Sequence, residues 1–370
     1  MSGERPNQRD LDRDDLTRRD SPHAGPPPQP GVAPARHASA RSAHGGAPVR
    51  GTAAGVGYFA LPPTAVDARP NGPTRLIVAW PGFDPPRAAA ALAAALPMTG
   101  VPVWRVFLEL PAVPATAGMS ASRAMSGGLG SSAFLEPSGI EAYGAVVEEA
   151  AARLPDVLAE LRRTLALEEG PVGLAGFSAG GAAALLVLAR GDVPVSTAAL
   201  VAPVIAPSRV AAAVEKRAGR DRAWPDGARE TAGRLDFGAR AGELARRDAA
   251  LLLIGGAKDR VVPPNEITAF RDALRRVGAP AVESATFRMG HALAAEPGTD
   301  ACPPITEAVR VDGVLTDWFR ERLAETTEPE PSAPAHTQPE QRPAPQTVAQ
   351  GPFSLDLSGT PLEPAAHLHR

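Results

Sequence analysis

The sequence predicts an α/β protein with a mostly parallel central sheet and helices on both faces. Two kinds of segment support this fold class. Short apolar runs, such as 75–80 and 249–254, have the composition of strands that are buried on both sides. Between the strands lie longer segments in which apolar residues recur every three or four positions, as in 140–167 and 306–323. Alternating strands and helices of this kind build a parallel sheet, whose ligands bind beyond the carboxyl ends of the strands.

Each element follows from its own stretch of sequence. The expected strands are the apolar runs at 75–80, 101–108, 171–175, 197–201, 249–254 and 282–289. The first long helix, 140–167, has apolar residues on one face and charged residues on the other, and 306–323 repeats this pattern. The continuous apolar run 182–189 predicts a helix that is buried on all sides.

Composition divides the chain of 370 residues into one folded domain and two tails. Residues 1–50 contain almost no bulky apolar side chains, and residues 327–370 are rich in proline, so we expect both to be disordered. Within the second tail, 353–357 alternates apolar and polar residues, as a short docking motif would. The remaining residues, 51–326, have a normal size for one α/β domain.

The segment Gly176-Phe177-Ser178-Ala179-Gly180-Gly181 carries the strongest functional signal. It lies between an expected strand and an expected helix, which places Ser178 at the apex of a sharp turn. Gly176 and Gly180, two residues on either side, allow the strand and the helix to pass closely. A chance match of this pattern is not rare in a chain with 36 glycines. The flanking strand and helix favour the interpretation of Ser178 as a nucleophile.

His291 is the candidate base for this nucleophile. A serine hydroxyl needs an imidazole that takes its proton and returns it to the leaving group. Of the 7 histidines, only His291 lies in the region expected to fold, since the other six lie in the tails. His291 follows the strand 282–289, although a loop histidine can also be a solvated surface residue.

Asp259 is the candidate carboxylate that orients the imidazole. It lies in the turn after the buried strand 249–254, where an aspartate could instead cap the next helix or form an Asx turn. The segment 202–205, which follows the preceding strand, contains no carboxylate. The oxyanion needs two N–H donors, and we expect those of Ala179 and of Phe83, in the loop Pro81-Gly82-Phe83-Asp84 after the strand 75–80.

These motifs, in this order along the chain, resemble those of the α/β-hydrolase superfamily, and within it the small esterases and dienelactone-hydrolase-like members. The resemblance spans residues 56–323 and implies the α/β-hydrolase fold, with triad order Ser178, Asp259, His291. One departure is that the oxyanion loop of the family usually begins His-Gly, whereas this chain has Pro81-Gly82.

The resemblance also implies a small helical lid at residues 206–247, where the superfamily commonly inserts a cap. This segment contains helical stretches at 210–217, 228–234 and 239–247, and its alternative role is a surface excursion that does not touch substrate. The long irregular loop 112–138 should border the mouth of the active site. The candidate substrate-pocket residues are Trp80, Met125 in this loop, and Trp224 in the lid.

Composition excludes several other classes of function. The net charge of −3 and an aromatic content of 4% argue against nucleic acid as a partner. No run of spanning length and no signal-peptide core is present, so we expect a cytoplasmic protein without a membrane span. The single cysteine, Cys302, excludes an intramolecular disulfide, and one histidine in the folded region is too few for a metal cluster. We therefore expect no metal and no cofactor.

The sequence predicts a cofactor-independent serine hydrolase that cleaves small carboxylic esters through an acyl-enzyme. A thioesterase, an acyltransferase or a peptidase would use the same triad and differ only in the bond or the acceptor. A binding protein that keeps the fold without turnover is the alternative from another class.

Overall fold

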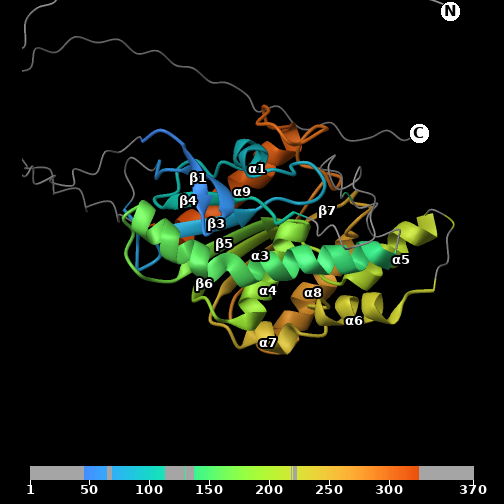
Figure 1. Cartoon of the computed structure of the whole chain (residues 1–370). Coiled ribbons are helices and arrows are strands. Elements are labelled where there is room, and N and C mark those ends of the chain that lie inside the picture. The colour runs from blue at the N-terminus through green and yellow to red at the C-terminus, as the bar shows by residue number, and fades with distance from the viewer. Residues whose placement is uncertain are drawn as a thin grey trace, which may run out of the picture. The chain divides into compact units, whose positions relative to one another are not determined.

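An eight-stranded sheet forms the centre of the computed structural model, which describes residues 46–64, 69–112, 130, 137–217, 219 and 223–324 (Figure 1). Contacts between Cα atoms divide the chain into Met1–Ala43 and His44–Arg370, and all the described residues lie in the second unit. The strands are arranged in the order β1-β2-β4-β3-β5-β6-β7-β8.

The strands from β4 to β8 pair in parallel, and this confirms the expected fold class. Their bounds are β3 (Leu76–Trp80), β4 (Trp104–Leu108), β5 (Val172–Phe177), β6 (Val195–Val201), β7 (Ala250–Gly256) and β8 (Val282–Phe287). The edge next to β4 is an antiparallel hairpin that the sequence did not predict, made of β1 (Val49–Ala53) and β2 (Val56–Leu61). Because β1 begins at Val49, the fold starts slightly before the expected boundary at residue 51.

Helices cover both faces of the sheet, and each face has its own apolar core. Because side chains alternate along a strand, Val78 and Trp80 of β3 face one core, whereas Ile77 and Ala79 face the other. The first core contains residues of α3 (Pro137–Thr164), α4 (Ala179–Arg190) and α8 (Pro264–Arg276). The second contains residues of α1 (Ala89–Ala95) and α9 (Thr306–Leu323). In Figure 1, α1 and α9 accordingly lie on the opposite side of the sheet from α3 and α4.

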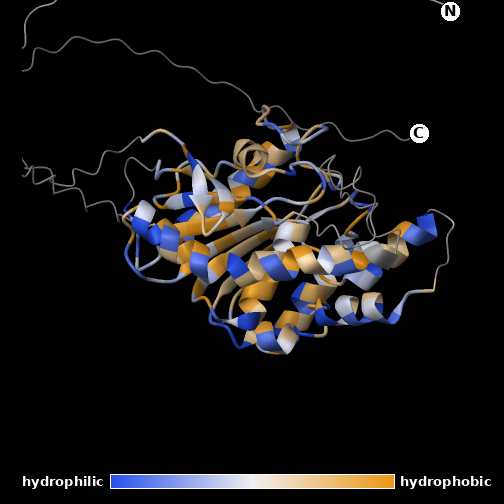
Figure 2. Ribbon diagram, viewed as in Figure 1, coloured by the Kyte–Doolittle hydropathy of each residue, from blue (hydrophilic) through white to orange (hydrophobic). Residues whose placement is uncertain are grey.

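The helix α4 is buried along its whole length up to Ala189. It packs against both α3 and β5, so it has no face in contact with water. Figure 2 shows the consequence in the sequence: α4 is largely apolar, whereas α3 alternates apolar and polar residues around its axis. The predictions of a buried helix after residue 181 and of an amphipathic helix before the elbow are both confirmed.

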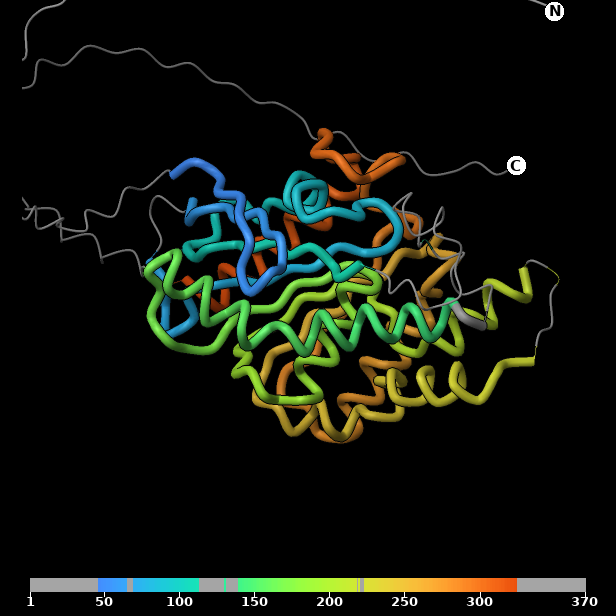
Figure 3. Tube along the Cα trace, in the orientation of Figure 1, coloured from blue at the N-terminus to red at the C-terminus, as the bar shows by residue number. Residues whose placement is uncertain are grey.

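Three short helices lie between β6 and β7, as the sequence predicted: α5 (Pro207–Arg217), α6 (Asp226–Arg234) and α7 (Ala241–Ala245). The helix α6 packs against the N-terminal half of α3 (Figure 3). The approach is close, because a Cβ atom at Gly144 of α3 would overlap the methyl group of Thr231 in α6. An ion pair of 3.0 Å between Arg234 and Glu148 adds a second contact. The segment is therefore fixed to α3.

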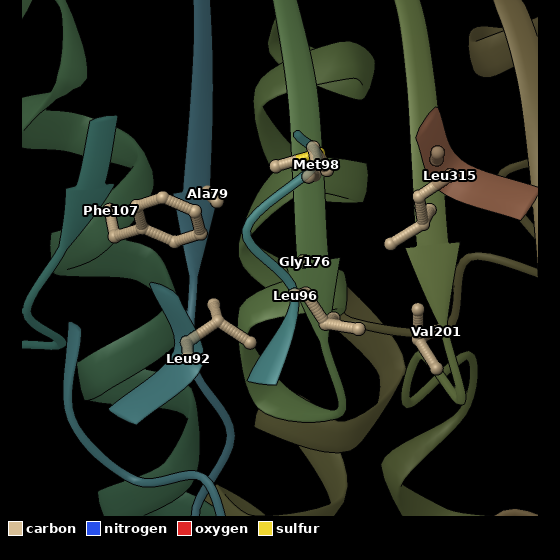
Figure 4. Close-up of a pocket in the computed structure, with 10 residues that line it drawn as sticks. Ala79, Leu92, Leu96, Met98, Phe107, Gly176, Val201 and Leu315 are labelled. Carbon is tan, nitrogen blue, oxygen red and sulfur yellow. The ribbon is translucent and has the colours of Figure 1, made fainter. Parts of the chain in front are cut away.

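A closed cavity of about 10 Å³ lies in the second core, between the sheet and the helices α1 and α9 (Figure 4). Gly176 of the predicted elbow contributes to its wall, and all the lining side chains are apolar. A hole of this size has room for one water at most, and an apolar cavity stays dry. Its lining residues are Ala79, Leu92, Leu96, Met98, Phe107, Ala175, Gly176, Ala199, Val201 and Leu315.

Candidate active site

Ser178 occupies a strained turn between β5 and α4. Its backbone has φ 54° and ψ −113°, and a conformation of this kind costs a non-glycine residue about 1–3 kcal/mol. Two hydrogen bonds to neighbouring segments hold the turn, from Ser178 N–H to the Val201 carbonyl (3.0 Å) and from Val204 N–H to the Ser178 carbonyl (3.2 Å). The structure thus places Ser178 at the carboxyl end of β5, in the strand–turn–helix context that the sequence predicted.

The glycines of the elbow allow backbones to approach closely. A Cβ atom at Gly180 would overlap the carbonyl oxygen of Trp80 at the end of β3. A Cβ atom at Gly176 would lie 2.5 Å from the carbonyl oxygen of Gly180. Real Cβ atoms do not occupy such positions, so both sites require glycine for steric reasons.

The structure brings Ser178, His291 and Asp259 together in one hydrogen-bonded chain. His291 Nε2 lies 2.9 Å from Ser178 Oγ, and His291 Nδ1 lies 2.8 Å from Asp259 Oδ2. Asp259 comes from the turn after β7 and His291 from the loop after β8, so all three residues lie beyond the carboxyl ends of strands. With Nδ1–H donating to the carboxylate, Nε2 is left to accept the serine proton. The arrangement has the geometry that general-base activation of a serine requires.

This chain of residues is almost completely removed from solvent. The exposed fractions are 4% for Ser178, 6% for Asp259 and 9% for His291. In surroundings with little water, charges and dipoles interact more strongly than they do in solution. The imidazolium that forms during proton transfer would therefore be stabilised effectively by Asp259.

The loop after β3 packs directly on the elbow. A Cβ atom at Gly82 would lie 2.9 Å from the Cβ of Ser178 and 2.8 Å from the ring of Phe177. Phe83 follows Gly82, and Ala179 follows Ser178 as the first residue of α4. Within the described part of the chain, neither backbone N–H donates a hydrogen bond to a protein acceptor. Their assignment as oxyanion donors stays a prediction, and this packing supports it.

Arg87 is a residue of the site that the sequence did not reveal. Its Nε donates to the carbonyl oxygen of Phe83 (2.7 Å), and its Nη1 donates to Glu296 Oε2 (2.6 Å). The backbone N–H of Arg87 also donates to the carbonyl oxygen of Gly298 (2.7 Å). The Arg87 guanidinium holds the pKa of the Glu296 carboxyl below its usual value. Arg87 therefore ties the loop that carries Phe83 to the chain segment that follows His291.

Asp84 is a second residue that the sequence analysis missed. Its Oδ2 lies 3.6 Å from His291 Nε2, the nitrogen that faces Ser178. Its side chain is 19% exposed, more than that of His291 at 7%. The available signal in the sequence was a carboxylate directly after the predicted donor Phe83, but sequence spacing does not show which way a loop side chain points.

The three candidate pocket residues have different fates. Trp80 is 1% exposed and belongs to the first core. Trp224 is half-buried, packs against the same core, and donates its Nε1–H to Glu215 Oε2 at 3.5 Å. Met125 lies outside the described residues. Contact between these residues and a substrate stays a prediction.

Two searches of the described residues gave negative results. They contain no group of three or more His, Cys, Asp or Glu side chains that could hold a metal ion. None of the helices in the same residues combines the length and the hydropathy needed to cross a bilayer.

Comparison with known proteins gives one sequence match. The sequence pattern of the prolyl oligopeptidase family matches residues 155–299, a region that contains Ser178, Asp259 and His291. Among curated proteins, no sequence matches the chain.

Similar solved structures share low sequence identity with this chain. A puromycin-hydrolyzing peptidase from Mycobacterium tuberculosis is 16% identical, with a TM-score of 0.50 over 74% of this chain and 40% of the peptidase. TT1662 from Thermus thermophilus is 20% identical, with a TM-score of 0.46 over 74% of this chain and 98% of its own. The Pyrococcus furiosus esterase Pf2001 is 13% identical, with a TM-score of 0.44 over 75% and 93% of the two chains.

The sheet topology, the strained serine elbow and the family match agree with the resemblance seen in the sequence. The chain belongs to the α/β-hydrolase superfamily and to the serine hydrolases within it.

Proposed function

We propose that this protein hydrolyses small carboxylic esters, with Ser178 as the nucleophile. The observation that supports this most directly is the continuous chain of hydrogen bonds from Asp259 through His291 to Ser178. In the first step, Ser178 Oγ attacks the acyl carbonyl while His291 Nε2 takes the hydroxyl proton. The N–H groups of Phe83 and Ala179 would hold the resulting oxyanion. Collapse of this intermediate expels the alcohol, which receives the proton from His291, and water then releases the acid by the same route.

The test is the Ser178→Ala variant. It should lose both turnover of p-nitrophenyl esters and labelling by a fluorophosphonate probe, because both need the serine hydroxyl. Ser208→Ala, in α5, is the matched control and should behave as the unmodified protein. Undiminished labelling in Ser178→Ala would place the nucleophile elsewhere.

A peptidase is the second candidate function. The match of residues 155–299 to the prolyl oligopeptidase family supports it, since the same triad can cleave an amide. Comparing kcat/KM for p-nitrophenyl esters of increasing acyl length with that for aminoacyl p-nitroanilides separates the two candidates. Product analysis with added thiol, alcohol or amine acceptors distinguishes a thioesterase or an acyltransferase. An initial burst of p-nitrophenol would exclude a binding protein without turnover.

We further propose that residues 51–326 form the catalytic domain and that the segment of α5, α6 and α7 acts as its lid. A truncation after residue 326 should then keep esterase activity. Trp224→Ala should raise KM for esters with long acyl chains more than KM for acetate esters. Equal effects on both would assign Trp224 to packing alone.

A further inference from the structure

The Asp84 carboxylate lies beside the position of the leaving group. In the proposed mechanism, His291 Nε2 delivers its proton to the departing oxygen, so the leaving group must lie next to that nitrogen. Asp84 Oδ2 is 3.6 Å from the same nitrogen. A carboxylate is therefore in reach of any polar group that the leaving alcohol carries on a short arm.

The direction of this carboxylate is set by its surroundings. A Cβ atom at Gly130 would lie 3.0 Å from Asp84 Oδ1, so this oxygen faces the backbone of Gly130, whereas Oδ2 faces the imidazole. The loop that carries Asp84 is braced by hydrogen bonds from Gly82 N–H to the Pro86 carbonyl (3.2 Å) and from Arg87 Nε to the Phe83 carbonyl (2.7 Å). The position of the negative charge is thus a feature of the loop.

The charges and rings around Asp84 favour a cationic ligand. The neighbouring cation Arg87 is occupied by Glu296, with contacts of 2.6 and 3.2 Å. Aromatic rings form other walls: Phe177 stands 5.2 Å from the His291 ring, and Phe83 makes an edge contact with Tyr143 at 5.8 Å. A carboxylate in apolar surroundings attracts a cation more strongly than it would in water, and it repels an anion to the same degree.

We propose that Asp84 determines specificity by binding a protonated amino group on the leaving group. The substrates are then esters whose alcohol carries an ammonium group two carbons from the ester oxygen. Esters with an anionic alcohol are rejected. This inference rests on the proposed function, because it takes His291 as the group that protonates the leaving alcohol.

A pair of esters with the same shape provides the test. In 2-(dimethylamino)ethyl acetate the alcohol ends in a protonated amine, and in 3-methylbutyl acetate a C–H group replaces the N–H group. At pH 7 the unmodified protein should prefer the charged ester in kcat/KM by about tenfold or more. Asp84→Asn should bring this ratio close to one, and Asp84→Glu, which keeps the charge, should restore part of the preference. Asp300→Asn removes an exposed carboxylate after His291 and should leave the ratio unchanged.

Two results would overturn the inference. One is a ratio that Asp84→Asn does not change. The other is an equal loss on both esters, which would mean that Asp84 acts on His291 and not on the substrate.

Labelling of Ser178 by a fluorophosphonate keeps the test decisive if both acetates turn over slowly. 2-(Dimethylamino)ethanol should then protect Ser178 from the probe better than 3-methylbutanol does, and Asp84→Asn should abolish the difference. Equal protection by the two alcohols in the unmodified protein would refute the subsite. Absence of any labelling would refute the proposed function itself, and the subsite with it.

Discussion

Asp259 holds His291 through one carboxylate oxygen and is itself held through the other. Oδ2 accepts the Nδ1–H of His291 at 2.8 Å, while Oδ1 accepts the backbone N–H groups of Val261 (2.7 Å) and Val262 (2.9 Å). The Asx turn that appeared as a structural alternative in the sequence is therefore present together with the contact to the imidazole. The carboxylate cannot rotate without losing three hydrogen bonds, so the orientation and the tautomer of His291 are fixed.

Asp259→Asn should reduce kcat by about four orders of magnitude, because an amide at this position favours the wrong tautomer of the imidazole. The fold should survive, since the amide oxygen can still accept the N–H groups of Val261 and Val262. Asp236→Asn changes a similar turn that caps Ala239 at 3.0 Å and serves as the control. Steady-state kinetics with circular dichroism measure both effects. Activity near that of the unmodified protein in Asp259→Asn would contradict this role.

Arg87→Ala should lower kcat by about tenfold to a hundredfold, because the loop that carries Phe83 loses its anchor and the oxyanion donor shifts. KM should change less. Arg162→Ala is a matched control: Arg162 likewise bonds a carboxylate, Glu169 (2.9 Å), and a backbone carbonyl, that of Gly170 (2.5 Å). If both variants lose the same activity, Arg87 contributes to general stability only.

Gly180→Ala should prevent stable folding or cost about 3 kcal/mol or more, because the new methyl group overlaps the Trp80 carbonyl, which belongs to the backbone and cannot move aside. Gly313→Ala in α9 should instead stabilise the protein by up to about 1 kcal/mol, since nothing lies within 4 Å of the new Cβ atom and alanine favours a helix. Urea denaturation of the two variants checks the opposite signs. A loss of stability in both would show that the steric argument fails.

Leu315→Ala enlarges the existing cavity behind Gly176 and should cost about 2–5 kcal/mol of unfolding free energy. Val309→Ala, in the same helix but 54% exposed, should change stability by less than about 0.5 kcal/mol. Thermal and urea unfolding measure both values. A small effect of Leu315→Ala would indicate that the core around the cavity collapses to fill the space.

Glu109→Gln should change how stability depends on pH. Burial raises the pKa of the Glu109 carboxyl, although the Ala89 N–H and the charge of Arg50 oppose this shift. The stability that the protonated carboxyl contributes is therefore complete below the ordinary pKa of glutamate and is lost as the pH rises through the higher folded-state value. Glutamine does not ionise and can still accept the Ala89 N–H. The stability of the variant relative to the unmodified protein should then increase from pH 4 to pH 7, as measured by thermal unfolding. A constant or decreasing difference would contradict the shift.

The triad could be predicted from the sequence because it depends on local patterns. In a parallel sheet, the turns after all strands lie on one edge, so Ser178, Asp259 and His291 converge once the strands are identified. The burial of Trp80 was also predictable, since the alternation in β3 places Trp80 on the same face as Leu76 and Val78, and all three pack in the first core.

Other features depend on contacts that sequence spacing does not encode. The strand β1 was missed because three of its five residues, Arg50, Gly51 and Thr52, are exposed, so it has no apolar alternation. Asp84 and Arg87 acquire their places through packing between the loops after β3 and after β8. These loops are separated by about two hundred residues along the chain, and no motif links them.

The complete burial of α4 has a consequence for inactivation. The helix begins at the residue after Ser178 and has no face from which water could loosen it, so the elbow belongs to the part of the protein that opens last. The backbone amides of the elbow should therefore exchange with deuterium only through global unfolding. On heating, catalysis should end together with the fold and not before it.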